Sequence, residues 1–197
     1  TSVSRGLGDV YKRQPATDPY LTTNYDLGNL SGKIECKTAL QAEMGLLEAP
    51  EVPLIGIVSR LTGQKGFDFS LPAIAKVLSE KVQFAILGSG ERWIMEEIAR
   101  LSEMNPEQLK FHNGYSEPLA HRIEAGSDFF LMPSLYEPCG LNQMYSLRYG
   151  TLPIVRAVGG LRDTVWEKDT SGGDGTGFVF TEPSADDTLA AIKRGID

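Results

Sequence analysis

The sequence predicts an α/β fold built on a doubly wound, mainly parallel β-sheet. Short runs that are apolar at nearly every position recur along the chain from residue 53 onward. Such runs are typical of strands buried on both faces, as in a parallel sheet covered by helices. Helix-length stretches separate them, which indicates repeated β–α units. Sheets of this kind bind ligands at the carboxyl ends of their strands, where loops lead into helices.

The expected elements are arranged in order along the chain. The strands are 54–58, 82–87, 109–112, 128–132 and 152–155, and the helices between them lie around 67–80, 91–104, 117–125 and 140–149. A last helical pattern over 185–195 stops almost as soon as it forms, so we expect the domain to be truncated at its C-terminus.

Residues 1–50, before the first expected strand, lack the alternation of apolar runs and helix-length stretches seen in the rest of the chain. Residues 1–14 show no period and do not resemble the rest of the chain, and we interpret them as an irregular lead that is foreign to the protein. Residues 15–50 form a linker and first helix: 15–33 is rich in Pro, Asp, Thr, Asn and Gly and predicts an irregular surface segment, and 33–47 predicts a short helix. Residues 51–197 are the ligand-binding domain.

Composition narrows the possible functions. A chain of 197 residues with 41% hydrophobic and 23% charged residues fits one globular domain. The formal net charge of −7 argues against nucleic-acid binding, and no apolar run is long enough to span a membrane. No secretory signal is visible. Two cysteines and two histidines make a disulfide framework or a metal site improbable, and we expect a cytoplasmic protein.

Two cations follow the first expected strand. Arg60 and Lys65 stand five residues apart in the glycine-bearing loop 59–66, where they could converge on a diphosphate or remain solvated loop charges. The string Gly88-Ser89-Gly90-Glu91 after the second strand lacks the third glycine of a dinucleotide fingerprint and predicts a tight turn. Tyr115, after the third strand, could stack on a nucleobase or simply pack.

The loops after the fourth and fifth strands offer further candidates. Gly140 opens the next expected helix, whose free N–H groups could receive an anion. Glu137 would face the same crevice or act as a helix-dipole partner, and Cys139 is interpreted as a buried structural thiol. Gly159 and Gly160 would let the backbone approach a ligand closely. The residues alone therefore predict an α/β domain that binds an anionic ligand.

Four of these segments, in order, resemble the C-terminal domain of bacterial glycogen synthases and plant starch synthases, retaining enzymes of glycosyltransferase family 5. They are Val58-Ser59-Arg60-Leu61-Thr62-x-Gln64-Lys65-Gly66, Glu137-Pro138-Cys139-Gly140-Leu141, Tyr149-Gly150-Thr151-Leu152-Pro153 and Gly159-Gly160-Leu161-x-Asp163-Thr164-Val165. The resemblance covers about residues 15–197. Tyr145 stands where the larger group of related transferases usually has a second glutamate, which favours the starch-synthase type.

The resemblance implies a Rossmann-like domain of the GT-B fold that binds ADP-glucose or UDP-glucose, and we expect ADP-glucose or ADP as the partner of this chain. It implies that Arg60 and Lys65 neutralise the donor diphosphate and that Glu137 lies by the donor glucose. The implied donor-binding residues are Tyr115, Cys139, Gly140, Leu141, Asn142, Gly159 and Gly160.

The family transfers glucose to the non-reducing end of an α-1,4-glucan, with retention and without a metal or cofactor. The glucan is carried by an N-terminal domain that this chain lacks, so we expect the isolated chain to be inactive, in a bacterial cytoplasm. A nucleotide-sugar-binding module without turnover and a UDP-glucose-dependent GT-B enzyme are the alternatives.

Overall fold

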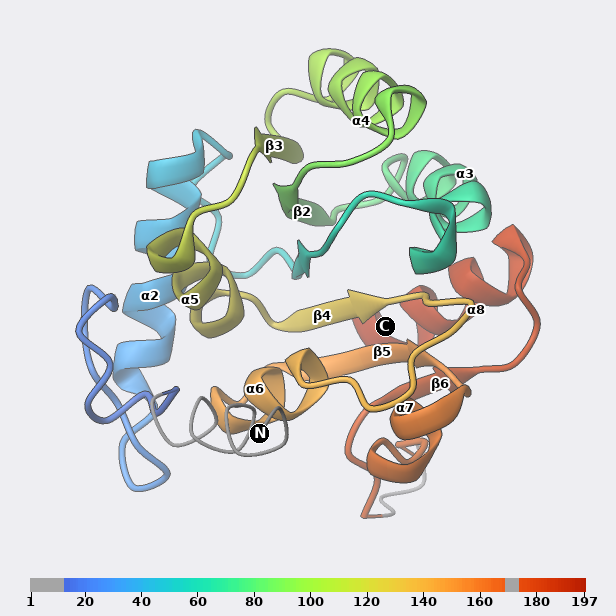
Figure 1. Cartoon of the computed structure of the whole chain (residues 1–197). Helices are drawn as coiled ribbons and strands as arrows, with labels where there is room; N and C mark the ends of the chain where they lie inside the picture. Colours follow the sequence, from blue (N-terminus) through green and yellow to red (C-terminus); the bar gives the residue numbers. More distant parts are fainter. Residues whose placement is uncertain (1–12, 169–173) are drawn as a thin grey trace.

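The computed structural model describes residues 13–168 and 174–197, which form a six-stranded sheet covered by helices (Figure 1). The strand order is β3-β2-β1-β4-β5-β6, and every neighbouring pair is parallel. The doubly wound parallel sheet predicted from the sequence is therefore confirmed.

The elements have well-defined bounds. The strands are β1 (Leu54–Val58), β2 (Gln83–Gly88), β3 (Leu109–Asn113), β4 (Phe129–Met132), β5 (Leu152–Arg156) and β6 (Phe178–Phe180). The helices are α2 (Ser31–Met44), α3 (Phe67–Val77), α4 (Arg92–Met104), α5 (Glu117–Gly126), α6 (Asn142–Arg148), α7 (Gly159–Thr164) and α8 (Ala185–Ile196), and a 3₁₀ turn, η1, covers Gly63–Lys65.

All five predicted strands exist within a residue or so of the expected bounds, but β6 and α7 were not predicted. β6 is three residues long and pairs only with β5 at the sheet edge. α7 is a six-residue helix that begins with two glycines, which are poor helix formers. Both elements depend on their neighbours in space, and neither is long enough to show a period in the sequence.

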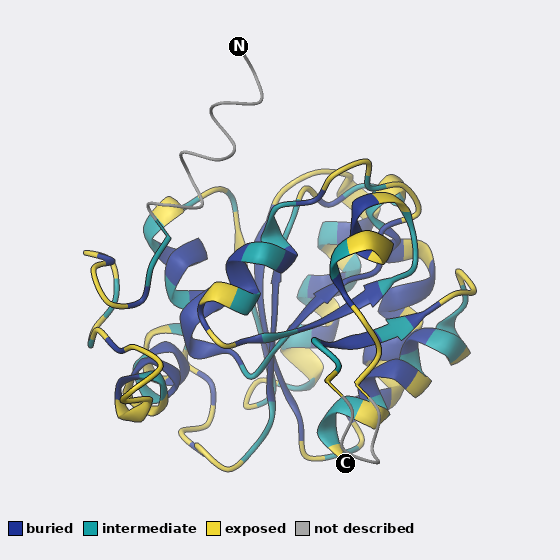
Figure 2. Ribbon diagram, turned by 90° about the horizontal axis from the view of Figure 1, so that it is seen from below, coloured by how far each residue is buried: buried dark blue, intermediate teal, exposed yellow. Residues whose placement is uncertain are grey.

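The strands alternate their side chains between two hydrophobic layers. Ile55 and Ile57 of β1 point into the layer shared with α3, α4 and α8, whereas Leu54 belongs to the layer shared with α2 and α5. Figure 2 shows strands buried along their length and helices that expose only their outer faces. α4 illustrates the pattern, because Ile94, Ile98 and Leu101 repeat at helical spacing on its buried side.

Residues 15–30 are irregular, as predicted, whereas α2 already begins at Ser31. This irregular segment is anchored to the domain rather than lying freely on the surface. The Asp18 carboxylate is 1% exposed and accepts a hydrogen bond from the Tyr149 hydroxyl. Its Oδ2 also lies 2.7 Å from Nδ1 of His121. The Tyr25 hydroxyl donates to the Tyr149 carbonyl at 2.8 Å. These partners are about 100 residues away in sequence, so local composition could not reveal the anchoring.

Two cations complete this anchoring. Lys33, on α2, donates to the carbonyls of Ala125 and Ser127 at 3.0 Å each and to Thr151 Oγ1 at 2.8 Å. Most of the lead 1–14 lies outside the described residues, but Arg13 pairs with Glu124 of α5. Burial raises the pKa of Glu124 to about 7 even though Arg13 opposes the shift.

The strand order creates one crevice that matters for ligand binding. From β1 the chain winds outward to β2 and β3, and from β4 it winds in the opposite direction to β5 and β6. The loops that follow β1 and β4 therefore leave the sheet on diverging paths. In open parallel sheets, ligands bind at this reversal, beyond the carboxyl ends of the two strands.

Candidate functional site

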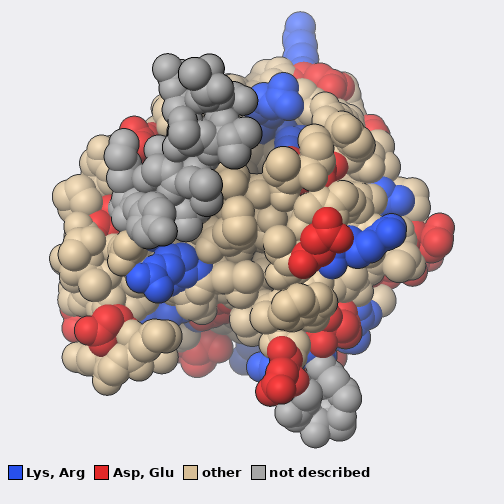
Figure 3. All heavy atoms as spheres, turned by 60° about the horizontal axis from the view of Figure 1, so that its bottom comes forward, with Lys and Arg blue, Asp and Glu red and all other residues tan. Residues whose placement is uncertain are grey.

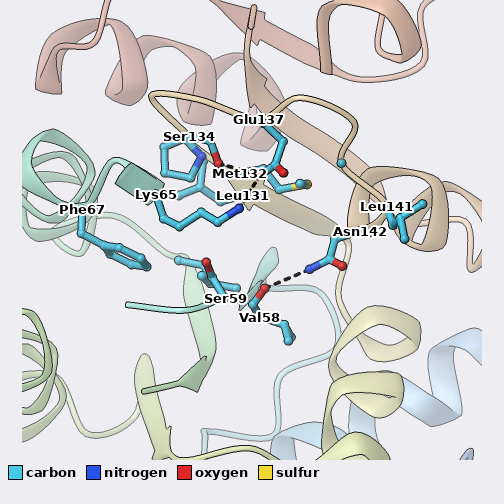
Figure 4. Close-up of a pocket in the computed structure, with 13 residues that line it drawn as sticks. Val58, Ser59, Lys65, Phe67, Leu131, Met132, Ser134, Glu137, Leu141 and Asn142 are labelled. Carbon is cyan, nitrogen blue, oxygen red and sulfur yellow. Dashed lines mark hydrogen bonds and ion pairs between the residues drawn. The ribbon is translucent and has the colours of Figure 1, made fainter. Parts of the chain in front are cut away.

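A pocket lies at the reversal point, beyond the carboxyl ends of β1 and β4 (Figure 4). Its walls come from two stretches of the chain that are distant in sequence. One runs from the end of β1 through η1 to the start of α3, and the other from the end of β4 to the start of α6. The lining includes Val58, Ser59, Lys65, Phe67, Met132, Pro133, Ser134, Glu137, Gly140, Leu141 and Asn142. Its volume is about 90 Å³, below the range typical of pockets that enclose a whole ligand.

Lys65 and Glu137 form an ion pair across this pocket. Lys65 Nζ donates to Glu137 Oε2, and the Ser134 hydroxyl donates to the same oxygen at 3.2 Å. The two charged side chains are 19% and 13% exposed, so water screens them only partly. Figure 4 shows the Lys65 side chain extending toward Glu137. An anion entering the pocket would compete with Glu137 for the lysine.

Gly66 allows the two loops that carry these charges to meet. Its φ is +79°, and a Cβ atom there would lie 2.0 Å from the Pro133 carbonyl oxygen. The Leu135 N–H donates to the Gln64 carbonyl at 2.9 Å and joins the same two loops. Only glycine combines this conformation with so close an approach, so the position of Lys65 opposite Glu137 depends on it.

Glu91 holds the lysine-bearing loop from its other side. Its Oε1 accepts the Gly63 N–H at 2.9 Å, and its Oε2 accepts the Trp93 indole N–H at 2.9 Å. These bonds, from Gly63 and then Trp93, lower the pKa of Glu91 and keep it ionised. The 88–91 string is the tight turn predicted, but the part that Glu91 plays in positioning the loop was missed. Its partner N–H is 28 residues away and leaves no sequence signal.

The start of α6 forms the opposite wall of the pocket. The helix begins at Asn142, two residues later than predicted, because Gly140 takes a left-handed φ of +64°. Asn142 Nδ2 donates to the Val58 carbonyl at 3.0 Å, which fixes α6 against the end of β1. The N–H groups of the first helical turn have no partner inside the helix. Gly140, Leu141 and Asn142 all line the pocket.

Cys139 is exposed, so its interpretation as a buried thiol was wrong. Pro138 and Cys139 form the exposed tip of the turn between Glu137, which faces the pocket, and Gly140, which is buried. Burial was expected because no His or Asn/Asp partner with motif support accompanies the thiol, but the left-handed turn at Gly140 leaves this tip in solvent.

Gly159 and Gly160 pack against the loop of Glu137. A Cβ atom on Gly159 would lie 2.1 Å from the Glu137 carbonyl oxygen, and one on Gly160 would lie 1.9 Å from the Cys139 carbonyl oxygen. The Gly160 N–H also donates to the Glu137 carbonyl at 3.1 Å. The close approach expected of these glycines is therefore made to another part of the backbone, and neither glycine lines the pocket.

Arg60 and Tyr115 follow β1 and β3 at the same edge of the sheet but lie outside the pocket lining. Arg60 is exposed, and its side chain forms no ion pair with any residue the structure describes. Tyr115 is 80% exposed. The structure thus brings Lys65, Glu137 and the start of α6 together in one pocket. The side chains of Arg60 and Tyr115 are not part of its lining.

The part of the chain that the structure describes can be compared with the other kinds of site considered from the sequence. Within residues 13–168 and 174–197, His, Cys, Asp and Glu form no group of three or more that could hold a metal. No helix in these ranges is both long enough and apolar enough to cross a membrane. On the face shown in Figure 3, acidic and basic side chains are interspersed. That distribution offers no broad basic surface for a nucleic acid.

Comparisons with known proteins agree with this geometry. The family described as "Glycosyl transferases group 1" matches residues 44–197. A glycogen synthase from Anaeromyxobacter dehalogenans is 50% identical over 189 residues, which are 96% of this chain and 39% of that protein. A glycogen synthase from Aeromonas hydrophila is 51% identical over 188 residues, 95% of this chain and 38% of that protein. The chain therefore spans about two fifths of the length of these relatives.

Solved structures give the same result for the fold. The catalytic domain of starch synthase IV from Arabidopsis thaliana, bound to ADP and acarbose, superposes with a TM-score of 0.88 at 35% identity, covering 95% of this chain and 40% of that one. HepE from Anabaena, in complex with UDP and glucose, superposes with a TM-score of 0.66 at 19% identity, covering 89% of this chain and 46% of that one. The Rossmann-like fold expected from the sequence resemblance is confirmed.

Proposed function

The chain belongs to the glycosyl transferases group 1 family, and we propose that it forms the donor-binding side of a glycogen or starch synthase. One observation carries the proposal: Lys65 and Glu137 face each other in a pocket at the reversal point of the sheet, beside the start of α6. Charged groups of both signs placed there suit a ligand that joins an anionic phosphate to a neutral sugar.

Lys65 is the residue we propose to bind the donor diphosphate. Its ammonium group is largely withdrawn from water, which strengthens its attraction for an anion. The N–H groups near Gly140 and Leu141, at the opposite wall, would hold the phosphate or sugar hydroxyls. Arg60 would reach the diphosphate from outside the pocket. Fixed positive groups at a departing phosphate stabilise the charge that builds there as the bond to the sugar breaks.

Glu137 is the residue we propose to contact the donor glucose. Once a phosphate has drawn Lys65 away, the Ser134 hydroxyl still holds the Glu137 carboxylate in place. A carboxylate beside the sugar can accept hydroxyl hydrogen bonds and stabilise positive charge at the anomeric carbon. Tyr115 would lie near the nucleotide base of the donor. Cys139, Gly159 and Gly160 would contribute through the backbone that shapes this loop.

The whole reaction that we propose is transfer of glucose from ADP-glucose to the non-reducing end of an α-1,4-glucan. The bond from the anomeric carbon to the diphosphate breaks, and the acceptor hydroxyl attacks from the same face and gives its proton to the departing phosphate oxygen, so configuration is retained. Cationic side chains and N–H groups supply the charge stabilisation, without a metal or cofactor. The glucan would bind largely to parts of the longer enzyme, and the isolated chain would not turn over. We propose the bacterial cytoplasm as its compartment.

Calorimetric titration of the chain with ADP, ADP-glucose and UDP tests the proposal. We expect ADP to bind more tightly than UDP, and a glucan-extension assay of the same sample to show no transfer. Tighter binding of UDP would favour the alternative, a UDP-glucose-dependent enzyme. If the folded chain bound no nucleotide, the proposal that its own residues form the donor site would be wrong.

A further inference from the structure

A second groove lies between the outer faces of α3 and α4. Its volume is about 610 Å³, considerably larger than that of the Lys65–Glu137 pocket. Leu71 and Pro72 of α3 form one side of it and Trp93 of α4 forms part of the other. The charged side chains that complete the lining are Asp68, Glu96, Glu97 and Arg100.

Trp93 gives this groove a fixed aromatic surface. Its side chain is 44% exposed, although large apolar side chains usually bury more of their surface. The bond from its indole N–H to Glu91 leaves the ring little freedom to turn. Glu91 is held in turn by the Gly63 N–H. The exposed ring therefore needs little reordering when it binds a flat apolar face.

The charged residues in the groove are also prearranged. Arg100 makes a two-pronged ion pair with Glu97, at 2.8 and 2.6 Å. Glu96 pairs with Arg92 at 2.7 Å. The lining holds three carboxylates and one guanidinium, and two of the carboxylates are paired with arginines. The small net negative charge that remains disfavours anions such as nucleotides and nucleic acids. Carboxylate oxygens retain free lone pairs that can accept hydroxyl groups.

These features suit one class of ligand, a neutral chain of pyranose sugars. A pyranose ring presents an apolar C–H face, which stacks on an indole ring, and a rim of hydroxyls, which bond to carboxylates and guanidinium groups. A hydrophobic peptide would desolvate the charged side chains of the lining without offering them hydrogen bonds. A phosphorylated ligand would be disfavoured by the net negative charge of the lining.

The groove adjoins the donor pocket through one short segment. Asp68, in the groove, follows Lys65, in the pocket, by three residues. Glu91 is bonded both to Gly63, in the lysine-bearing loop, and to Trp93, in the groove. A polymer held in the groove would therefore run beside the place where the donor sugar is presented.

We propose that the α3–α4 groove, centred on Trp93, binds a stretch of α-glucan away from the reacting end. This inference rests on the proposed function, because it takes the glucan to be the acceptor. It adds a binding site on the donor-side domain itself, which would keep a growing glucan close to the donor pocket.

Native gel electrophoresis in gels containing glycogen tests the inference, with the chain and three variants. Trp93→Ala removes the ring, and Trp93→Phe keeps an aromatic face but loses the bond to Glu91. Trp166→Ala is the matched control, because Trp166 is 62% exposed and lies outside the groove. We expect glycogen to retard the parent chain and Trp166→Ala equally. Trp93→Ala should weaken the apparent affinity about tenfold, and Trp93→Phe should lie between them.

The inference would be overturned if glycogen failed to retard the parent chain, or if Trp93→Ala ran like the parent. Equal losses in Trp93→Ala and Trp166→Ala would overturn it too. Calorimetry with ADP on the same proteins separates the two proposals. An absence of glycogen retardation with ADP binding intact refutes the groove alone, whereas Trp93-dependent retardation without ADP binding refutes the donor site alone.

Discussion

Replacing Gly160 with alanine should displace the loop that carries Glu137 and weaken donor binding. The new Cβ atom would lie 1.9 Å from the Cys139 carbonyl oxygen, 2.6 Å from its carbonyl carbon and 2.8 Å from its Cα. All three are backbone atoms, so no side-chain rotation can relieve the contact. Real Cβ contacts essentially never fall below 3.0 Å, and 3.0 minus 1.9 means a shift of about 1 Å.

The energetic cost can be worked out from these contacts. Forcing extra volume into a closely packed contact destabilises a protein by about 1–3 kcal/mol. Loss of the 3.1 Å bond from the Gly160 N–H to the Glu137 carbonyl adds about 1 kcal/mol. We therefore expect the free energy of unfolding to fall by about 2–4 kcal/mol. A displaced Glu137 would no longer reach the donor glucose, so the affinity for ADP-glucose should fall relative to that for ADP.

Urea unfolding measures the first effect, and calorimetry with ADP-glucose and with ADP measures the second. Gly63→Ala is the matched control, because its Cβ would meet only the flexible end of Asp68, at 3.2 Å. That substitution should change stability by less than about 0.5 kcal/mol. If Gly160→Ala matched the control in both assays, the reasoning that these glycines shape the Glu137 loop would be refuted.

Two further substitutions probe carboxylates outside the pocket lining, one buried on α5 and one that holds the lysine-bearing loop. Burial raises the pKa of Glu124 from 4.5 to about 7, so the folded state binds more protons than the unfolded state in this window. Stability should therefore decline by about 3 kcal/mol from pH 4.5 to 7, and Glu124→Gln should flatten that slope in urea titrations. Glu91→Ala should free the Gly63 N–H and loosen the lysine-bearing loop. Faster amide hydrogen exchange at Gly63, with several-fold weaker ADP binding, would support this role, and unchanged exchange would contradict it.

The central strands could be predicted because the sheet buries them on both faces. The runs 54–58 and 83–88 are apolar almost throughout, and each leads into a helix-length stretch. β6 escaped prediction because three edge residues cannot show a pattern. The anchoring of Asp18 was also invisible, since its partners lie on α5 and just after α6.

The candidate site was predictable only in part, for a related reason. Lys65 and Glu137 could each be placed after a strand, but they are 72 residues apart. Only the strand order, with β1 beside β4, brings them together. Glu91 and Gly160 contribute through hydrogen bonds to the backbone and through close backbone contacts, which leave no mark on residue type or spacing.

The ADP affinity of Lys65→Ala tests the donor site most directly. Lys81→Ala is the control of equal charge change, since Lys81 is exposed and precedes β2 at the opposite edge of the sheet. We expect Lys65→Ala to weaken ADP binding about tenfold or more in calorimetry, because it removes a charge-assisted hydrogen bond from a partly buried pocket. Lys81→Ala should leave the affinity unchanged. Equal affinities for ADP in the two variants would contradict the assignment of this pocket as the donor site.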